Sequence, residues 1–185
     1  MNAANQAADG MMTESELRTQ LASHHAVSFG WALSCCAHHQ AEAEDVLQTV
    51  YLKILQGRAR FHGRSSFKTW LFAVIRNTAA DERRRQWLRA LGLTLFVRRR
   101  AQEPTGAEPA GRWAAAEVQR DLQAALARLP RRQREILHLV FYQDLSVQAA
   151  SEVMGVSVGS ARTHYERGKK RLRQWLQPAE RGYAS

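Results

Sequence analysis

The chain has 185 residues, of which 45% are hydrophobic and 24% charged, a composition typical of a globular protein and not of a disordered or fibrous one. Its formal net charge of +10 indicates a polyanionic partner, either nucleic acid or an anionic membrane surface. The length exceeds one small domain and falls short of two large ones, so we expect two compact units joined by a linker.

The charge is unevenly distributed along the chain. Residues 1–62 hold four basic and six acidic side chains, residues 63–111 hold ten and four, and residues 112–185 hold thirteen and seven. The acidic first third suggests that this part faces a protein. The N-terminus has no signal-peptide pattern and no stretch reaches the ~18 apolar residues of a membrane span, so we expect a cytoplasmic protein without direct membrane insertion.

The first half of the chain reads as helical. Residues 14–56 carry apolar side chains at mostly three- and four-residue spacing, which predicts two or three amphipathic helices. The glycines and serines of residues 57–66 predict a loop, in which Ser65 or Ser66 can cap the following helix. That helix is predicted over residues 67–85, with an apolar stripe along it and a basic run at its end.

The second half begins with a linker. Residues 86–112 combine an apolar piece, Leu91–Val97, with consecutive arginines and then prolines and glycines. A helix is predicted from Trp113 up to Pro130, which disfavours helix at its predecessor. We therefore expect an all-α fold of two small helical domains joined by a flexible linker, with boundaries at 13–87, 88–112 and 113–178.

A three-helix unit follows Pro130. Its first helix is predicted over residues 131–143, with four side chains directed inward: Ile136, Leu137, Val140 and Phe141. Ser146 caps a short helix that ends at Met154, Gly155 supplies the turn, and Ser157 caps a long helix to about Gln177. This layout is that of a helix-turn-helix, whose second helix enters the DNA major groove. The alternative is a protein-docking helical hairpin with a solvated basic face.

Two separated sets of motifs carry a family resemblance. The runs LPRRQREIL from Leu129, DLS from Asp144 and GVSVGSART from Gly155 resemble the promoter-binding C-terminal domain of bacterial sigma factors. The runs AEDVLQTVYLKIL from Ala43 and SSFKTWLFAVIRNTAADERRR from Ser65 are similar to the other domain that the extracytoplasmic-function (ECF) group retains. The resemblance covers roughly residues 17–87 and 117–177, and the two halves together in this order are highly specific.

The resemblance implies an alternative sigma factor that binds core RNA polymerase and directs transcription initiation at a two-part promoter, under the control of an anti-sigma factor. It implies that five residues grip the polymerase clamp: Glu44, Asp45, Leu47, Gln48 and Val50. The alternative is that Leu47 and Val50 belong to the core, and we expect this of one of them.

The same resemblance assigns the DNA contacts. Strand opening at the −10 element needs aromatic rings to replace base stacking and cations to hold phosphates. The residues implied there are His62, Arg64, Ser65, Phe67, Trp70, Arg76, Asn77, Arg83 and Arg84. Trp70 has a competing interpretation as a core residue. The residues implied at the −35 element are Ser160, Arg162, Thr163, His164, Arg167, Lys170 and Arg171.

Other classes are weaker. The main alternative is a stand-alone helix-turn-helix regulator. A third possibility is an RNA-binding adaptor, but the sequence has no aromatic signature for stacking on RNA bases, which counts against it. No phosphate-binding loop, nucleophile elbow or zinc-hydrolase helix is present, so we expect neither enzymatic activity nor a cofactor. The adjacent Cys35 and Cys36, near two pairs of histidines, form neither a disulfide framework nor a metal site, because neighbouring helical residues point about 100° apart.

Overall fold

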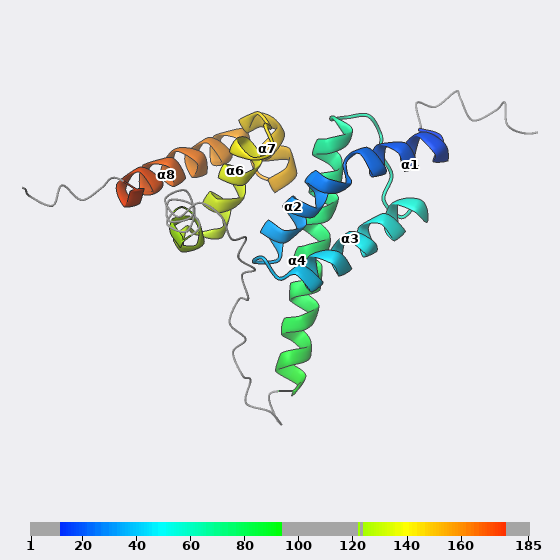
Figure 1. Ribbon diagram of the computed structural model, residues 1–185, viewed down its shortest axis with the longest axis horizontal. Coiled ribbons are helices and arrows are strands. Elements are labelled where there is room, and N and C mark those ends of the chain that lie inside the picture. Colours follow the sequence, from blue (N-terminus) through cyan, green and yellow to red (C-terminus); the bar gives the residue numbers. More distant parts are fainter. Residues whose placement is uncertain (1–11, 94–121, 123, 177–185) are drawn as a thin grey trace, which may run out of the picture. The chain divides into compact units, whose positions relative to one another are not determined.

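The computed structural model describes residues 12–93, 122 and 124–176 (Figure 1). All regular secondary structure within these ranges is helical, which confirms the all-α fold. The chain divides into two compact units, Met1–Gly106 and Ala107–Ser185, which are called unit 1 and unit 2 below.

The described part of unit 1 contains four helices. They are α1 (Glu14–Ser23), α2 (His25–Cys35), α3 (Gln40–Leu55) and α4 (Phe67–Leu93). The region predicted to hold two or three helices thus holds three. The first begins at a capping box, in which the Thr13 side chain accepts from the Glu16 amide and the Glu16 carboxylate accepts from the Thr13 amide.

The core of unit 1 lies where α2, α3 and α4 contact one another in pairs. Trp31 of α2 is fully buried and its indole Nε1 donates a 3.0 Å hydrogen bond to the backbone oxygen of Phe72, which is also fully buried. Leu71 and Ile75, one turn apart on α4, and Val50 of α3 are fully buried as well. The exposed faces of α3 and α4 are therefore held in a defined relation to each other.

The turn between α2 and α3 has an unusual backbone. Ala37 and His38 have φ angles of +53° and +66°, a left-handed conformation that residues with a Cβ adopt at a cost. The turn is closed by a 2.8 Å hydrogen bond from the His38 amide to the Leu33 carbonyl. Arg83 of α4 holds the same region, because its guanidinium donates to the carbonyl of Cys35.

Helix α4 is longer than the sequence predicted. Ser66 caps it, since its hydroxyl accepts from the Thr69 amide at 3.1 Å, as expected. It continues to Leu93 and not only to residue 85, so residues 88–93, which were predicted as linker, are helical. The basic run does not end the helix, because arginine and leucine are both good helix formers. The rest of the predicted linker, residues 94–112, lies outside the described residues.

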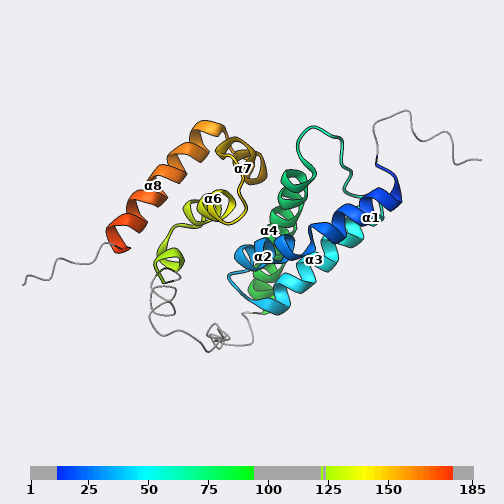
Figure 2. The same cartoon turned by 45° about the horizontal axis from the view of Figure 1, so that its top comes forward.

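Unit 2 is the predicted three-helix arrangement. Residues 124–128 are helical and are followed by α6 (Arg131–Phe141), α7 (Val147–Met154) and α8 (Val158–Leu176), which Figure 2 shows from a second side. As expected, Ser146 caps α7, and Gly155 forms the turn with a φ of +62°. Ser157 caps the next helix through a 3.2 Å bond from the Ser160 amide.

Core placement in unit 2 differs from the prediction at one position. Ile136 and Leu137 are buried as expected and Val140 is half-buried, whereas Phe141 is 58% exposed and Leu139 is buried in its place. Phe141 is the last residue of α6, so its side chain lies at the edge of the unit and stacks on Tyr165 of α8.

Candidate nucleic-acid and polymerase interfaces

Helix α8 presents a polar face at its first turns. Ala161 is fully buried and anchors the helix against the rest of unit 2. Around it, Ser160, Arg162, Thr163 and Arg167 are exposed and His164 is half-buried. Helix α8 thus offers hydrogen-bonding side chains at its N-terminal turns, where a helix-turn-helix meets base edges.

Further along α8 the cations are in part engaged with neighbouring side chains. Lys169 lies 4.7 Å above the Tyr165 ring, and Arg171 donates a 3.2 Å hydrogen bond to the side chain of the buried Gln133 in α6. Lys170 and Arg173 are exposed. Arg171 therefore braces the α6–α8 contact, whereas Lys170 and Arg173 add positive charge to the surface of the helix.

Aromatic rings cluster where the loop before α4 meets the start of that helix. The ring centroids of Phe61, Phe67 and Trp70 lie 5.3–5.5 Å apart in all three pairings. His24, from the junction of α1 and α2, adds a fourth ring 5.5 Å from Phe67. All four residues are half-buried, so Trp70 is neither a core residue nor a free surface ring.

Phe61 and His24 were not among the predicted site residues. Phe61 stands in an irregular loop, where no periodicity marks a side chain as part of a cluster, and His24 is distant in sequence. The one signal in the sequence that could have indicated Phe61 is its aromatic side chain next to the basic residues of the loop. Such a group of rings can stack on unpaired bases, which have exposed π faces.

The other residues predicted for the −10 element lie along the same loop and helix. His62, Arg64 and Asn77 are exposed, and Ser65 and Arg76 are half-buried. Arg84 is exposed, whereas the neighbouring Arg83 is half-buried with its guanidinium directed at Cys35. The structure thus gives the two adjacent arginines different surroundings.

The residues predicted for polymerase binding separate by burial. Glu44, Asp45 and Gln48 are exposed on α3, whereas Leu47 and Val50 are 3% and 0% exposed. The expectation that one of the two apolar residues is core holds for both. Both side chains therefore belong to the core of unit 1, and the polar three form the accessible part of the set.

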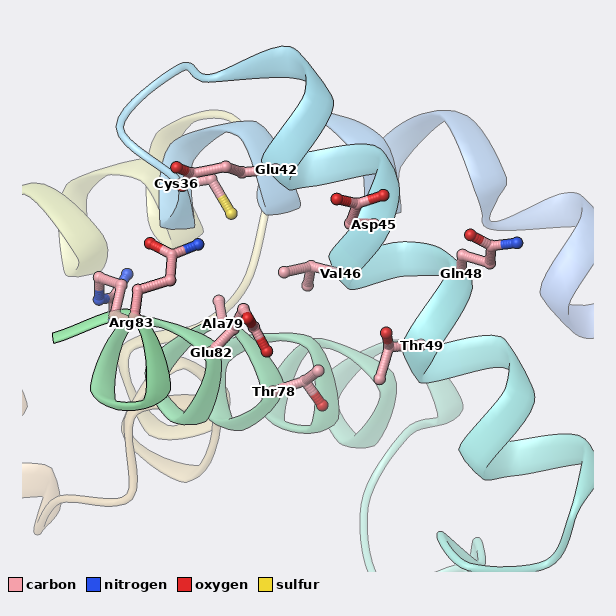
Figure 3. Close-up of a pocket in the computed structure, with 11 residues that line it drawn as sticks. Cys36, Glu42, Asp45, Val46, Gln48, Thr49, Thr78, Ala79, Glu82 and Arg83 are labelled. Carbon is pink, nitrogen blue, oxygen red and sulfur yellow. The ribbon is translucent and has the colours of Figure 1, made fainter. Parts of the chain in front are cut away.

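A polar cleft of about 250 Å³ lies between α3 and α4 beside these residues (Figure 3). Asp45 and Thr49 face Thr78 and Glu82 across it, and Cys36 lies at one end. Burial, with a smaller contribution from the Glu42 carboxylate, raises the pKa of the Cys36 thiol to about 11 against the opposing effect of Arg83. The thiol is therefore protonated at neutral pH.

The described ranges hold neither a metal-binding cluster nor a membrane-spanning helix. Within residues 12–93, 122 and 124–176 no three histidine, cysteine or acidic side chains are placed to hold a metal ion. No described helix has the length and apolar character to cross a membrane.

The chain matches family models in both units. Residues 21–89 match the model described as "Sigma-70 region 2", and residues 119–172 match "Sigma-70, region 4". The first range covers α2, α3 and α4 up to residue 89, and the second covers α6, α7 and α8 up to residue 172, so each match falls within one helical unit.

Individual proteins agree with these matches. The ECF RNA polymerase sigma factor SigX of Bacillus subtilis is 34% identical over 143 residues, which cover 74% of this chain and 71% of SigX. RNA polymerase sigma factor SigZ of the same species is 27% identical, with 75% and 74% covered. The fold is similar to that of the sigma factor RpoE from Bartonella quintana, solved with the anti-sigma factor NepR, with a TM-score of 0.68 at 22% identity over 89% of this chain and 99% of RpoE. On this evidence the chain belongs to the ECF family of RNA polymerase sigma factors.

Proposed function

We propose that the chain acts as an alternative sigma factor and that its two units have different binding functions. Unit 1 binds core RNA polymerase and holds the opened −10 element, and unit 2 reads the −35 element. The observation that carries this proposal is the presence of both family-matched units, in this order, each with its own exposed polar or aromatic surface. Since RNA synthesis is the chemistry of the polymerase, the chain itself acts as a binding and positioning factor in the cytoplasm.

Polymerase binding is assigned to the exposed edge of α3. Glu44, Asp45 and Gln48 lie beside a cleft whose walls add the carboxylates of Glu42 and Glu82. Such a surface complements a basic partner segment, because desolvated carboxylates hold guanidinium groups in bidentate geometry. Leu47 and Val50 support this surface from beneath.

Strand opening is assigned to the ring cluster and the basic residues around it. Phe67, Trp70 and Phe61 can replace the stacking that a base loses on leaving the duplex, and Asn77 can pair with a base edge. Phosphate contacts come from the cations on the loop and α4, of which His62, Arg64 and Arg84 are exposed. Ser65, Arg76 and Arg83 complete the set.

Reading of the −35 element is assigned to α8. Arg162, Thr163 and His164, with Arg167 one turn later, occupy the turns that enter the major groove. Ser160 and Lys170 contact DNA phosphates that flank these base contacts. Arg171 keeps α8 in position through its hydrogen bond to Gln133.

Control by an anti-sigma factor is the remaining part of the proposal. The sigma factor RpoE, which has a similar fold, was solved with the anti-sigma factor NepR, and CnrH, also of similar fold, was solved with the cytosolic domain of CnrY. The TM-score to CnrH is 0.59, at 21% identity over 88% of this chain and 89% of CnrH. An inhibitor of this kind would cover the polymerase and promoter surfaces of the chain.

The deciding experiment is in vitro transcription with purified core polymerase on a pool of promoter fragments, with and without this protein. Specific transcripts that depend on the added protein are expected, and their start sites reveal both promoter elements. DNA binding without polymerase binding or transcripts would contradict the proposal and point to a stand-alone regulator.

A further inference from the structure

A histidine from a distant part of the sequence is the one member of the ring cluster that can accept a hydrogen bond. His24 lies at the junction of α1 and α2, and its ring is 5.5 Å from that of Phe67, at an interplanar angle of 57°. The phenyl rings of Phe61 and Phe67 carry no polar atom, and the indole of Trp70 can only donate. Any hydrogen bond accepted by a ring of this cluster is therefore accepted by His24.

The end of α1 fixes which ring nitrogen of His24 carries the proton. Nδ1 lies 2.8 Å from the carbonyl oxygen of Gln20, in the last turn of that helix. Because a carbonyl oxygen can only accept, Nδ1 is the donor of this hydrogen bond. The Ser23 hydroxyl, 3.1 Å from Nδ1, donates to the same carbonyl at 3.0 Å. In the neutral imidazole Nε2 is therefore the unprotonated nitrogen, which accepts.

The Nε2 atom of His24 is free to bind a ligand. Among the residues that the structure describes, none is hydrogen-bonded to this nitrogen, and the side chain is half-buried and not enclosed. The two nitrogens point away from each other across the ring, so the bond of Nδ1 to Gln20 directs Nε2 away from the α1 backbone. The cluster thus combines three stacking rings with one acceptor whose ring is held in place.

We propose that His24 is a specificity-determining residue of the −10 site, whose Nε2 accepts from the exocyclic amino group of an unpaired base stacked on the ring cluster. The group at C6 of a purine or C4 of a pyrimidine is an amino donor in adenine and cytosine and a carbonyl acceptor in guanine and thymine. Nε2 pairs with the first two and faces a second acceptor in the others. The ring cluster therefore selects adenine or cytosine.

This inference rests on the proposed function, because an unpaired base reaches the cluster only when the chain and the polymerase open a promoter. It goes beyond that function, since stacking on aromatic rings tolerates every base. One net hydrogen bond corresponds to about threefold to tenfold in affinity, which sets the size of the expected preference.

The test is binding of the holoenzyme, assembled from core polymerase and the full chain, to templates whose −10 region is mismatched and open. Each of the four bases is placed in turn at each open position of either strand. At one position, adenine or cytosine should be bound about threefold to tenfold more tightly than guanine and thymine. No discrimination at any position, or a preference only for guanine or thymine, would overturn the proposal.

Changes of single groups on both partners assign the hydrogen bond. His24→Phe keeps a ring beside Phe67 without an acceptor and should lose the preference. Replacing the preferred base by its analogue without the amino group, purine for adenine or 2-pyrimidinone for cytosine, should weaken binding of the unchanged chain and not of His24→Phe. His24→Gln, whose amide oxygen can accept, should keep part of the preference. If His24→Phe still distinguishes the base from its analogue, another group reads the base and the proposal is wrong.

His25 is the matched control. It is the next residue in the chain and is exposed, but its Nδ1 lies 3.1 Å from the Tyr51 hydroxyl of α3, with the two rings 6.0 Å apart. His25→Phe should leave the base preference unchanged. An equal loss in His25→Phe and His24→Phe would show that disturbance of the α1–α2 junction, and not loss of the acceptor, is responsible, and would overturn the proposal.

The same measurements separate this inference from the proposed function. A holoenzyme that transcribes from the open templates, with a base preference that His24→Phe does not change, would sink this inference alone. A chain that binds neither core polymerase nor, with it, any of these templates would sink the proposed function and the inference with it.

Discussion

Gly168 of α8 lies directly against Leu137 of α6: a Cβ atom at position 168 would be 2.9 Å from Cδ1 and 3.3 Å from Cγ of that leucine. Leu137 is only 1% exposed, so it has little room to move. The close approach of α6 and α8 depends on this glycine. The orientation of α8 within unit 2 therefore depends on it as well.

Gly168→Leu should destabilise unit 2 by about 1–3 kcal/mol, because overpacking of the α6–α8 contact outweighs the better helix propensity of leucine. The change is measured by urea denaturation followed by circular dichroism. Gly159 is the control on the same helix, since a Cβ there meets nothing within 4 Å. Gly159→Leu should be neutral or stabilising, and an equal loss in both variants would refute the packing argument.

Ala37→Gly should stabilise unit 1 by about 0.5–1 kcal/mol, because glycine relieves the left-handed conformation at φ +53° by more than it adds to the entropy of the unfolded chain. Ala41, exposed in the first turn of α3, is the control. Ala41→Gly should instead destabilise by up to about 1 kcal/mol, since glycine is a poor helix former. Thermal denaturation of both variants shows whether each substitution raises or lowers the stability of the protein. A lower stability of both variants would contradict the prediction.

Asp45→Arg should weaken binding to core polymerase by about tenfold or more, because it places a cation where the α3 edge is proposed to meet a basic segment. Glu14→Arg makes the same charge change on α1, where Glu14 forms only an exposed pair with Arg18. Fluorescence titration with labelled core enzyme measures both. Equal effects of the two variants would show that net charge, and not the α3 edge, governs binding.

Phe61→Ala should lower transcription about ten- to hundredfold, since loss of one base–aromatic stack costs about 1–3 kcal/mol. The defect should be small on a template whose −10 region is already mismatched and open. Phe61→Tyr keeps a ring and should retain most of the activity. A defect of the same size on open and duplex templates would mean that Phe61 does not act in strand opening.

Arg162→Ala and Lys170→Ala should behave differently at the −35 element. The first should cost about 1–3 kcal/mol and relax specificity at one base position, as expected for a base-edge contact. The second should weaken binding to all sequences alike and reduce the slope of affinity against salt by about 1. The affinity of each variant for duplexes that contain the −35 element, measured at several salt concentrations, separates the two roles. If both variants show the same dependence on sequence and salt, the assigned roles are wrong.

Much of the local structure could be predicted because its causes are local. Apolar spacing marked the helices, and the caps at Ser66, Ser146 and Ser157, with the turn at Gly155, follow from side chains within three residues of the backbone they serve. The family followed from motifs that lie in two continuous stretches.

The sequence could not assign burial at the ends and edges of helices. Leu47 and Val50 look like surface candidates within a functional motif, yet both are buried, because α2 and α4 both pack against α3. Phe141 fits an inward position by spacing and is exposed, because α6 ends there. Periodicity defines an apolar face and does not say how far along a helix that face is covered.

By itself, then, the sequence determined the all-α class, the helix-turn-helix and the ECF sigma family. Only the tertiary structure decided that Phe61 and His24 join the ring cluster, that Arg83 is directed at Cys35 while Arg84 is exposed, and that α4 extends past its core. The physical reason is range: caps and periodicity depend on neighbours in the chain, whereas burial and side-chain partners depend on helices that meet only after folding.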